Sequence, residues 1–339
     1  MDHQATNSPY DDRMGKASRA KTEPDRRARI AAQREAERRA EQRRRIYLAG
    51  GSILVVVIVV IAFVLVKLNS GGGTAAPSSN GPTGSALATV TKEVTDIPSS
   101  ITDQVAGGKV PAAFFVDAKT SSAVSSVSNS MGSYFATVDG TPLTQNGLPE
   151  VLFIGSDYCP YCAAQRWAMI NAFSRFGTFT GLTTTHSSSS DIDPNTPTFT
   201  FYGSKYTSKY ISFTSVELNT NEREGNSTSS SVPYVTLQTP TAAEESLQTA
   251  YDPGTYIPFI DFGNKYAQVG NISPLAPTML DGKTWAQVAS AMNDPSSTIA
   301  QAELANANYE TAAVCVLTNN QPATACTPTI QKLETTLAK

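Results

Sequence analysis

Two cysteines separated by Pro-Tyr lie between a strand-like and a helix-like stretch, in FIGSDYCPYCAAQRW at residues 153–167. Residues 150–154 are largely apolar and are flanked by proline and glycine, which is typical of a buried strand. Beyond the pair, apolar residues recur at three- and four-residue steps as far as residue 176, which predicts an amphipathic helix with Trp167 and Phe173 on its buried face. The sequence therefore places both sulfurs at a junction between a strand and a helix.

The position of the two cysteines predicts redox chemistry. Cys159 would lie at the amino end of the helix, where unpaired backbone N–H groups and the positive end of the helix dipole favour a thiolate. Cys162, one turn later, would be shielded and within bonding reach, so we expect Cys159 to attack and Cys162 to resolve. Pro160 suits the first helical turn because its missing N–H costs nothing there, and Tyr161 completes the CPYC motif.

The elements predicted after this junction complete a mixed α/β pattern. They are β-rich stretches, a short helix, a hairpin and three further helices, at 178–185, 198–202, 209–218, 242–250, 256–263 with 265–269, 285–292, 298–316 and 328–338. The polar residues 219–231 are expected to form a loop. This order, β-α-β, then an insertion, then β-β-α, is that of the thioredoxin fold. We therefore predict an α/β, thioredoxin-like fold with an insertion between the βαβ and ββα halves and extra C-terminal helices.

Ile257-Pro258 opens the strand that would face the cysteine pair. Enzymes with a thioredoxin fold keep a cis-proline at this place, and a cis X–Pro bond costs only about 0.5–1 kcal/mol. A proline inside a strand is also best tolerated at the strand entry. We predict a cis Ile257–Pro258 bond beside the redox pair, with an ordinary trans proline as the alternative.

Longer strings carry a family resemblance. CPYC after a strand resembles the active motif of glutaredoxins and of DsbA-like thiol oxidoreductases. The strings FIGSDYCPYCAAQRWAM, FSRFGTF and YIPFIDFGNKY resemble a prokaryotic, membrane-anchored, thioredoxin-like family catalogued as a domain of unknown function (DUF929). The resemblance spans about Pro142 to Cys326 and implies the fold without a substrate. In one departure, the buried carboxylate that thioredoxins carry six residues before the first cysteine is Phe153 here.

The other two cysteines, Cys315 and Cys326, bracket a polar turn between two predicted helices. We predict a structural disulfide, which for a loop of this size would contribute about 3 kcal/mol. A relay pair that exchanges with Cys159 and Cys162 is the alternative. A static disulfide between Cys159 and Cys162 also stays open, whereas a zinc site would need closer ligand pairs than this spacing offers. We expect neither a metal nor a cofactor.

An uncharged run, IYLAGGSILVVVIVVIAFVLV at residues 46–66, is long enough to span a membrane, since a helix rises about 1.5 Å per residue and the hydrocarbon layer is roughly 30 Å thick. Three arginines at 43–45 precede it, and only Lys67 follows closely. The positive-inside rule then places the amino terminus in the cytoplasm. We predict a single-pass plasma-membrane protein with an extracytoplasmic main domain; a cleaved signal peptide and a buried core helix are the alternatives.

Charge and composition divide the chain around this run. Residues 1–45 carry 13 Lys+Arg and 8 Asp+Glu, a net charge of +5, and are predicted to form a basic cytoplasmic arm. Residues 67–86, rich in Gly, Ser, Pro and Ala, are predicted to be a flexible linker. Residues 87–339 form the predicted extracytoplasmic thioredoxin-like domain. Neither composition nor pattern indicates a nucleic-acid-binding domain.

The function predicted from these features is that of a membrane-tethered, extracytoplasmic thiol–disulfide oxidoreductase. Its expected partners are protein thiols or disulfides, together with a membrane redox partner. The alternative is a non-catalytic thioredoxin-fold module that binds or scaffolds other envelope proteins and holds structural disulfides. His186, in THSSSSDID, could belong to a hydrolase triad, but no nucleophile motif such as GxSxG accompanies it, so a loop histidine is the preferred interpretation.

Overall fold

The central strand of the sheet is covered on both faces. In the computed structural model, which describes residues 81–109, 131–138, 140–269 and 275–338, β3 (Leu148–Gly155) is buried from Glu150 to its end. Four consecutive apolar residues, Val151 to Ile154, lie in this stretch, as is typical of a strand with no solvent-facing side. The strand predicted at 150–154 is thus confirmed.

The sheet around β3 is mixed. β8 (Ser212–Glu217) runs parallel to β3, whereas β11 (Phe259–Phe262) pairs with the other side of β3 in antiparallel register. β12 (Tyr266–Val269) and β1 (Ala136–Thr137) extend the sheet beyond β11, and β2 (Thr144–Gln145) pairs with the start of β3. The predicted hairpin of two strands after residue 256 is β11 and β12.

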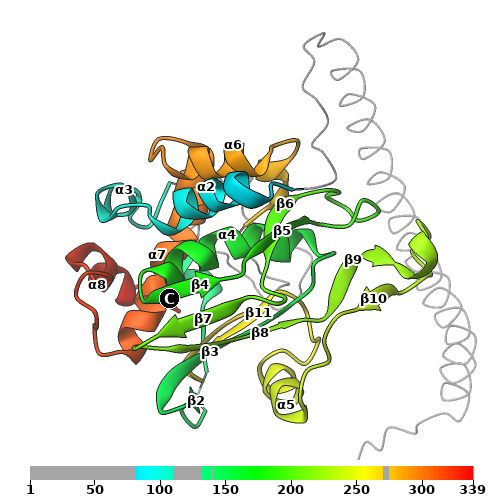
Figure 1. Ribbon diagram of the computed structural model, residues 1–339. Helices are drawn as coiled ribbons and strands as arrows, with labels where there is room; N and C mark the ends of the chain where they lie inside the picture. The colour runs from blue at the N-terminus through cyan, green and yellow to red at the C-terminus, as the bar shows by residue number, and fades with distance from the viewer. Residues whose placement is uncertain (1–80, 110–130, 139, 270–274, 339) are drawn as a thin grey trace, which may run out of the picture. The chain divides into compact units, whose positions relative to one another are not determined.

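Helices cover the two faces of this sheet (Figure 1). α4 (Pro160–Ser174) and α7 (Thr298–Leu317) pack against each other, and both contribute to a core that includes Val151 and Phe153 of β3. The alternate residues Leu152 and Ile154 belong to a second core, against which α5 (Ala242–Tyr251) packs. Trp167 and Phe173 are wholly buried in the first core, as predicted.

Further helices pack around α4 and α7. α2 (Gly84–Thr95) packs on α4 and α6 (Trp285–Met292), while α3 (Ser99–Val105) and α8 (Pro328–Glu334) pack on α7. The helices expected at 242–250, 285–292, 298–316 and 328–338 are all present, so the chain has a mixed α/β architecture with seven α-helices among its described residues. The last part of the predicted linker, residues 84–86, forms the first turn of α2.

Three small antiparallel pairs lie beside the main sheet: residues between α4 and β8 form two of them, and the segment between β8 and β11, where the insertion was predicted, forms the third. β4 (Gly177–Thr180) pairs with β7 (Lys205–Ser208), and β5 (Thr183–His186) pairs with β6 (Pro197–Thr200). β9 (Asn219–Arg223) pairs with β10 (Tyr234–Thr236), although residues 219–231 were expected to form a loop. A 3₁₀ turn at Glu224–Asn226 follows β9.

The predicted localisation requires a correction. None of the helices in the part of the chain that the structure describes is long and apolar enough to cross a bilayer. This finding contradicts the prediction of a single-pass plasma-membrane protein with an extracytoplasmic main domain. The predicted span at 46–66, the arm at 1–45 and residues 67–80 of the linker all lie outside the described residues.

Candidate functional site

The first turn of α4 carries the cysteine pair. Cys159 is the N-cap residue, with an extended backbone (φ −76°, ψ 119°), and Pro160 follows it at the start of the helix. The sulfur of Cys159 accepts a hydrogen bond from the backbone N–H of Cys162 at 3.2 Å. Cys159 thus takes the role that serine or aspartate usually has at a helix start, and its sulfur faces the unpaired N–H groups of the first turn.

The structure brings the predicted site residues together. Cys159 and Cys162 are both free cysteines, and the Sγ of Cys159 lies 3.9 Å from the carbonyl oxygen of Ile257. The Ile257–Pro258 bond is cis, as predicted, and it leads directly into β11. Tyr161, the other motif residue, is partly buried against the same core.

Both sulfurs are sheltered in this structure. Cys162 is wholly buried, as expected of a resolving cysteine, but Cys159 is also only 4% exposed. Burial raises the pKa of the Cys162 thiol well above its usual value, and the hydrogen bond and charge of Cys159 add to that rise. The positive charge of Arg166 and the backbone N–H of Ser156 act in the opposite direction.

A buried charge cluster lies behind the pair. Nε and Nη2 of Arg166 donate to the two carboxylate oxygens of Glu217, in β8, at 2.9 and 2.6 Å. Nη2 of Arg166 also lies 3.6 Å from Oδ1 of Asp157, which precedes the motif. Arg166 and Glu217 are wholly buried, so the bidentate pair forms where the low dielectric makes charge interactions strong.

Asp157 differs from the other members of this cluster in its pKa. Burial raises its pKa to about 6, because Arg166 only partly offsets the loss of water and Glu217 adds a second negative charge. Burial opposes the charge of Arg166, but Glu217 and Asp157 outweigh that effect and raise the pKa of Arg166. The guanidinium is therefore a fixed positive charge, whereas Asp157 can take up or release a proton near neutral pH.

Sequence reasoning found Phe153 but missed its charged neighbour. The guanidinium carbon of Arg166 lies 5.6 Å from the centre of the Phe153 ring. Arg166 follows Cys162 by four residues, inside a helix whose other inward residues are mostly apolar. A lone cation at that spacing was the signal available in the sequence; its partner Glu217 could be found only from the pairing of β8 with β3.

The β9–β10 pair lies beside the residue that precedes Cys159. The rings of Tyr158 and Tyr234 stack in parallel, with centres 4.1 Å apart. On Tyr234 lies the guanidinium of Arg223, 3.9 Å from the ring centre, and its Nη2 donates to the Tyr234 hydroxyl at 2.9 Å. A backbone bond from Asp157 N–H to the Asn219 carbonyl at 2.9 Å further joins β9 to the site.

The remaining predicted residues lie outside this cluster. Cys315 and Cys326 form a disulfide between the end of α7 and the residues before α8. His186 lies in β5 rather than in a loop, with Nδ1 2.8 Å from the Ser187 carbonyl oxygen, and Asn221 donates to the His186 carbonyl at 3.0 Å.

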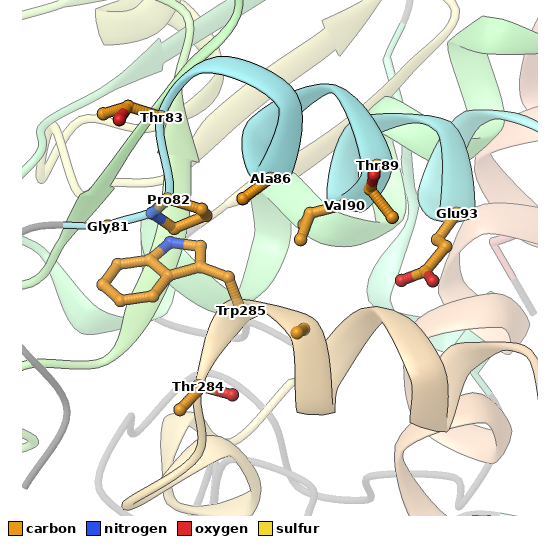
Figure 2. Close-up of a pocket in the computed structure, with 10 residues that line it drawn as sticks. Gly81, Pro82, Thr83, Ala86, Thr89, Val90, Glu93, Thr284 and Trp285 are labelled. Carbon is orange, nitrogen blue, oxygen red and sulfur yellow. The ribbon is translucent and has the colours of Figure 1, made fainter.

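A pocket of about 620 Å³ opens elsewhere, between α2 and α6. Figure 2 shows the indole of Trp285 below Pro82, with Glu93 at the far end of the row of α2 side chains. Glu93 is the only ionisable residue among the described residues that line it. The pocket therefore offers shape and apolar surface but little chemistry.

Comparison with known proteins gives a family. No curated protein and no solved structure matches the chain. The family model described as "Domain of unknown function (DUF929)" matches residues 134–315, which is more than half of the chain. The match includes the strand, the cysteine pair, the insertion, the β11–β12 hairpin and most of α7. The chain therefore belongs to the DUF929 family.

Proposed function

We propose that this chain is a thiol–disulfide oxidoreductase that uses Cys159 and Cys162 on a thioredoxin-like fold. The observation that carries the proposal is the pair of free cysteines in the first turn of α4, with the sulfur of Cys159 accepting the Cys162 N–H at 3.2 Å. The strand order supports the fold assignment: β8 is parallel to β3, and β11 and β12 follow on the other side in antiparallel register. The proposed partners are protein thiols or disulfides.

The reaction follows from the two positions. The thiolate of Cys159 attacks one sulfur of a substrate disulfide, forms a mixed disulfide and releases the other substrate sulfur as a thiolate. Cys162 then loses its proton and attacks the Cys159 sulfur, and the bond between Cys159 and the substrate breaks. The protein leaves with a Cys159–Cys162 disulfide and the substrate leaves reduced; the reverse sequence transfers a disulfide to a dithiol.

A second candidate is a binding or scaffold module without catalysis. The 4% exposure of Cys159 favours it, because an attacking sulfur must meet its substrate. For catalysis, the residues around Cys159 have to move far enough to admit a substrate sulfur. Tyr158, Tyr234 and Ile257 are the partly buried neighbours that would do so.

The discriminating experiment compares the full chain with Cys159→Ser and Cys162→Ser variants. We expect the wild type to reduce insulin with dithiothreitol as electron donor, or to reactivate scrambled ribonuclease, and Cys159→Ser to lose the activity. Cys162→Ser should instead accumulate a mixed disulfide, visible as an added mass, because the resolving thiol is missing. If the wild type and Cys159→Ser are equal in both assays, the binding module is the better interpretation.

A further inference from the structure

Arg166 shares a helix face with the resolving cysteine. It follows Cys162 by four residues on α4, a spacing that places two side chains next to each other along a helix. Both residues are wholly buried, so little water separates or screens them. Burial raises the pKa of the Cys162 thiol, and the charge of Arg166 is the side-chain effect that opposes this rise.

Acidic side chains hold only part of the Arg166 guanidinium. Nε and Nη2 of Arg166 are bound to Glu217, and Nη2 is also near Asp157. The remaining nitrogen, Nη1, is buried and has no hydrogen-bond partner among the described residues. A buried donor left unpaired costs about 1–3 kcal/mol, which is a reason to look for a function in the charge itself.

The charged and titratable groups that act on Cys162 or on Arg166 come from several elements. Cys159 caps α4, Asp157 and Tyr158 lie in the connection that precedes it, and Glu217 lies on β8. His186, from β5, acts on Asp157. In this set Arg166 is the cation that acts on Cys162, and the carboxyl group of Asp157 can accept a proton near neutral pH.

These charges allow a balanced resolving step. The Cys162 proton has to pass to a base, and the Asp157 carboxylate, 3.6 Å from Nη2 of Arg166, is the group of the cluster able to take it. One negative charge then moves from an oxygen to a sulfur, and the total charge around Arg166 does not change. The Cys162 sulfur then bonds to the Cys159 sulfur, and the electron pair of the broken bond leaves on the substrate sulfur. Throughout this step Arg166 faces, besides Glu217, either the Cys162 thiolate or the Asp157 carboxylate, but not both.

We propose that Arg166, held by Glu217 and Asp157, is a positioning residue that stabilises the thiolate of Cys162 while Cys162 resolves the mixed disulfide. This inference rests on the proposed function and adds a residue to it. Phe153 and Glu217 give the guanidinium a fixed place behind the pair. The attacking step of Cys159 does not depend on Arg166.

The test separates the two steps with 5,5′-dithiobis(2-nitrobenzoic acid) (DTNB) on the reduced full chain. Attack by Cys159 releases one thionitrobenzoate (TNB), and resolution by Cys162 releases a second. An opposite charge at close range lowers a thiol pKa by about 1–3 units, so loss of the Arg166 charge should slow the second phase at least tenfold and leave the first phase within about twofold.

Three variants test the contribution of the Arg166 charge to the second phase. In Arg166→Met/Glu217→Met the whole ion pair is replaced by apolar groups of similar size, which a folded core tolerates better than one stranded charge. Arg166→Lys should restore most of the second-phase rate. Arg175→Met is the matched control: Arg175 is another cation on the end of α4, bound to Asn171 and Asn308, and its loss should change neither phase.

A second readout does not depend on turnover. In a Cys159→Ser background labelled with ¹³C at the cysteine Cβ, the Cys162 titration midpoint should rise by at least one pH unit when the Arg166–Glu217 pair is replaced. The signals of the Cys315–Cys326 disulfide serve as a non-titrating internal reference. An unchanged midpoint and an unchanged second phase in a variant with native near-ultraviolet circular dichroism would overturn the proposal, as would equal slowing of both phases.

Failure of the proposed function would give a different result. The wild type would then have no activity on insulin or ribonuclease, while the two TNB phases would still respond to Arg166.

Discussion

Asp261 is a buried carboxyl group in the middle of the sheet. It lies on β11 with no exposed surface, and its Oδ1 accepts the backbone N–H of Asn264 at 2.7 Å. Burial raises its pKa to about 6; the hydrogen bond from Asn264 opposes the rise and the nearby carboxyl group of Glu150 adds to it. The protonated form is therefore the one that the fold prefers.

This preference predicts a pH dependence of stability. The pKa of Asp261 in the folded state, about 6, is above its ordinary value of 3.8, so its contribution is fully present below pH 3.8 and is lost as the pH rises through about 6. Asp261→Asn mimics the protonated form and keeps the acceptor for Asn264. We expect the variant to match the wild type at pH 4 and to exceed its unfolding free energy at pH 8 by on the order of 1–3 kcal/mol.

Urea unfolding followed by circular dichroism at pH 4, 6 and 8 measures this difference. Asp294→Asn is the matched control, because Asp294 is exposed and hydrogen bonds from Ser296 lower its pKa. That variant should lose stability at neutral pH rather than gain it. A gain that is the same at pH 4 and pH 8 for Asp261→Asn would contradict the argument.

Some residues of the candidate site are placed by their neighbours in the chain, and others are placed by distant contacts. Cys159, Pro160 and Cys162 could be placed from the sequence because helix capping depends on neighbours in the chain. Arg166 and Glu217 could not be paired, since 51 residues separate them and only the sheet brings them together. The burial of Cys159 was also missed, because the covering residues come from the insertion and from the segment before β11.

The junction between β3 and α4 is the element on which the site depends. Gly155 ends the strand, and a Cβ atom added there would lie 2.3 Å from Cζ of Phe153 and 3.2 Å from the sulfur of Cys162. Phe153 is wholly buried and its ring packs against Phe201, with ring centres 5.3 Å apart. Both neighbours are wholly buried, so the added atom would press on packed side chains.

Gly155→Ala should therefore disturb stability and chemistry together. Overpacking of a core typically costs about 1–3 kcal/mol, and the displaced Cys162 sulfur should slow the second TNB phase more than the first. Gly107→Ala is a suitable comparison, since its added Cβ would meet no atom of the described residues closer than 3.5 Å. Denaturant unfolding and the DTNB assay measure both effects; a Gly155→Ala protein with the stability and kinetics of wild type would show that the junction can adapt.

Elements with local signals were predicted well, and those that depend on distant contacts were not. α6 begins at the predicted residue because Thr284 forms a capping box with Gln287 at its start, and it also ends at the predicted residue. β9 carries a polar sequence with no strand pattern, and its partner β10 contributes Tyr234 to the Tyr158–Tyr234–Arg223 stack. The strands between α4 and β8 were expected from composition, but composition does not state which strand pairs with which.

At the scale of the whole molecule, a disulfide and hydrogen bonds join the C-terminal segment to the helical layer. The Cys315–Cys326 disulfide joins the end of α7 to the residue before Thr327, which caps α8. Thr327 donates to Asp103 of α3 at 2.9 Å, and the Ala338 N–H donates to the Gly132 carbonyl at 2.9 Å. The disulfide thus fixes a segment that contacts elements from the first half of the described chain.

A structural disulfide and a relay pair predict different results for Cys315→Ala/Cys326→Ala. Both cysteines are buried, at 0% and 1% exposure, so a substrate or the Cys159–Cys162 pair could reach their sulfurs only after neighbouring residues move. With a structural role, the double variant should lose about 2–4 kcal/mol of unfolding free energy and keep both TNB phases and its activity on insulin. If the pair is a relay, the double variant should instead keep nearly the same unfolding free energy, measured with Cys159 and Cys162 oxidised. It should also turn over protein substrates more slowly. Chemical denaturation and the two assays on the same preparation decide between these roles, and we expect the loss of stability without a loss of exchange.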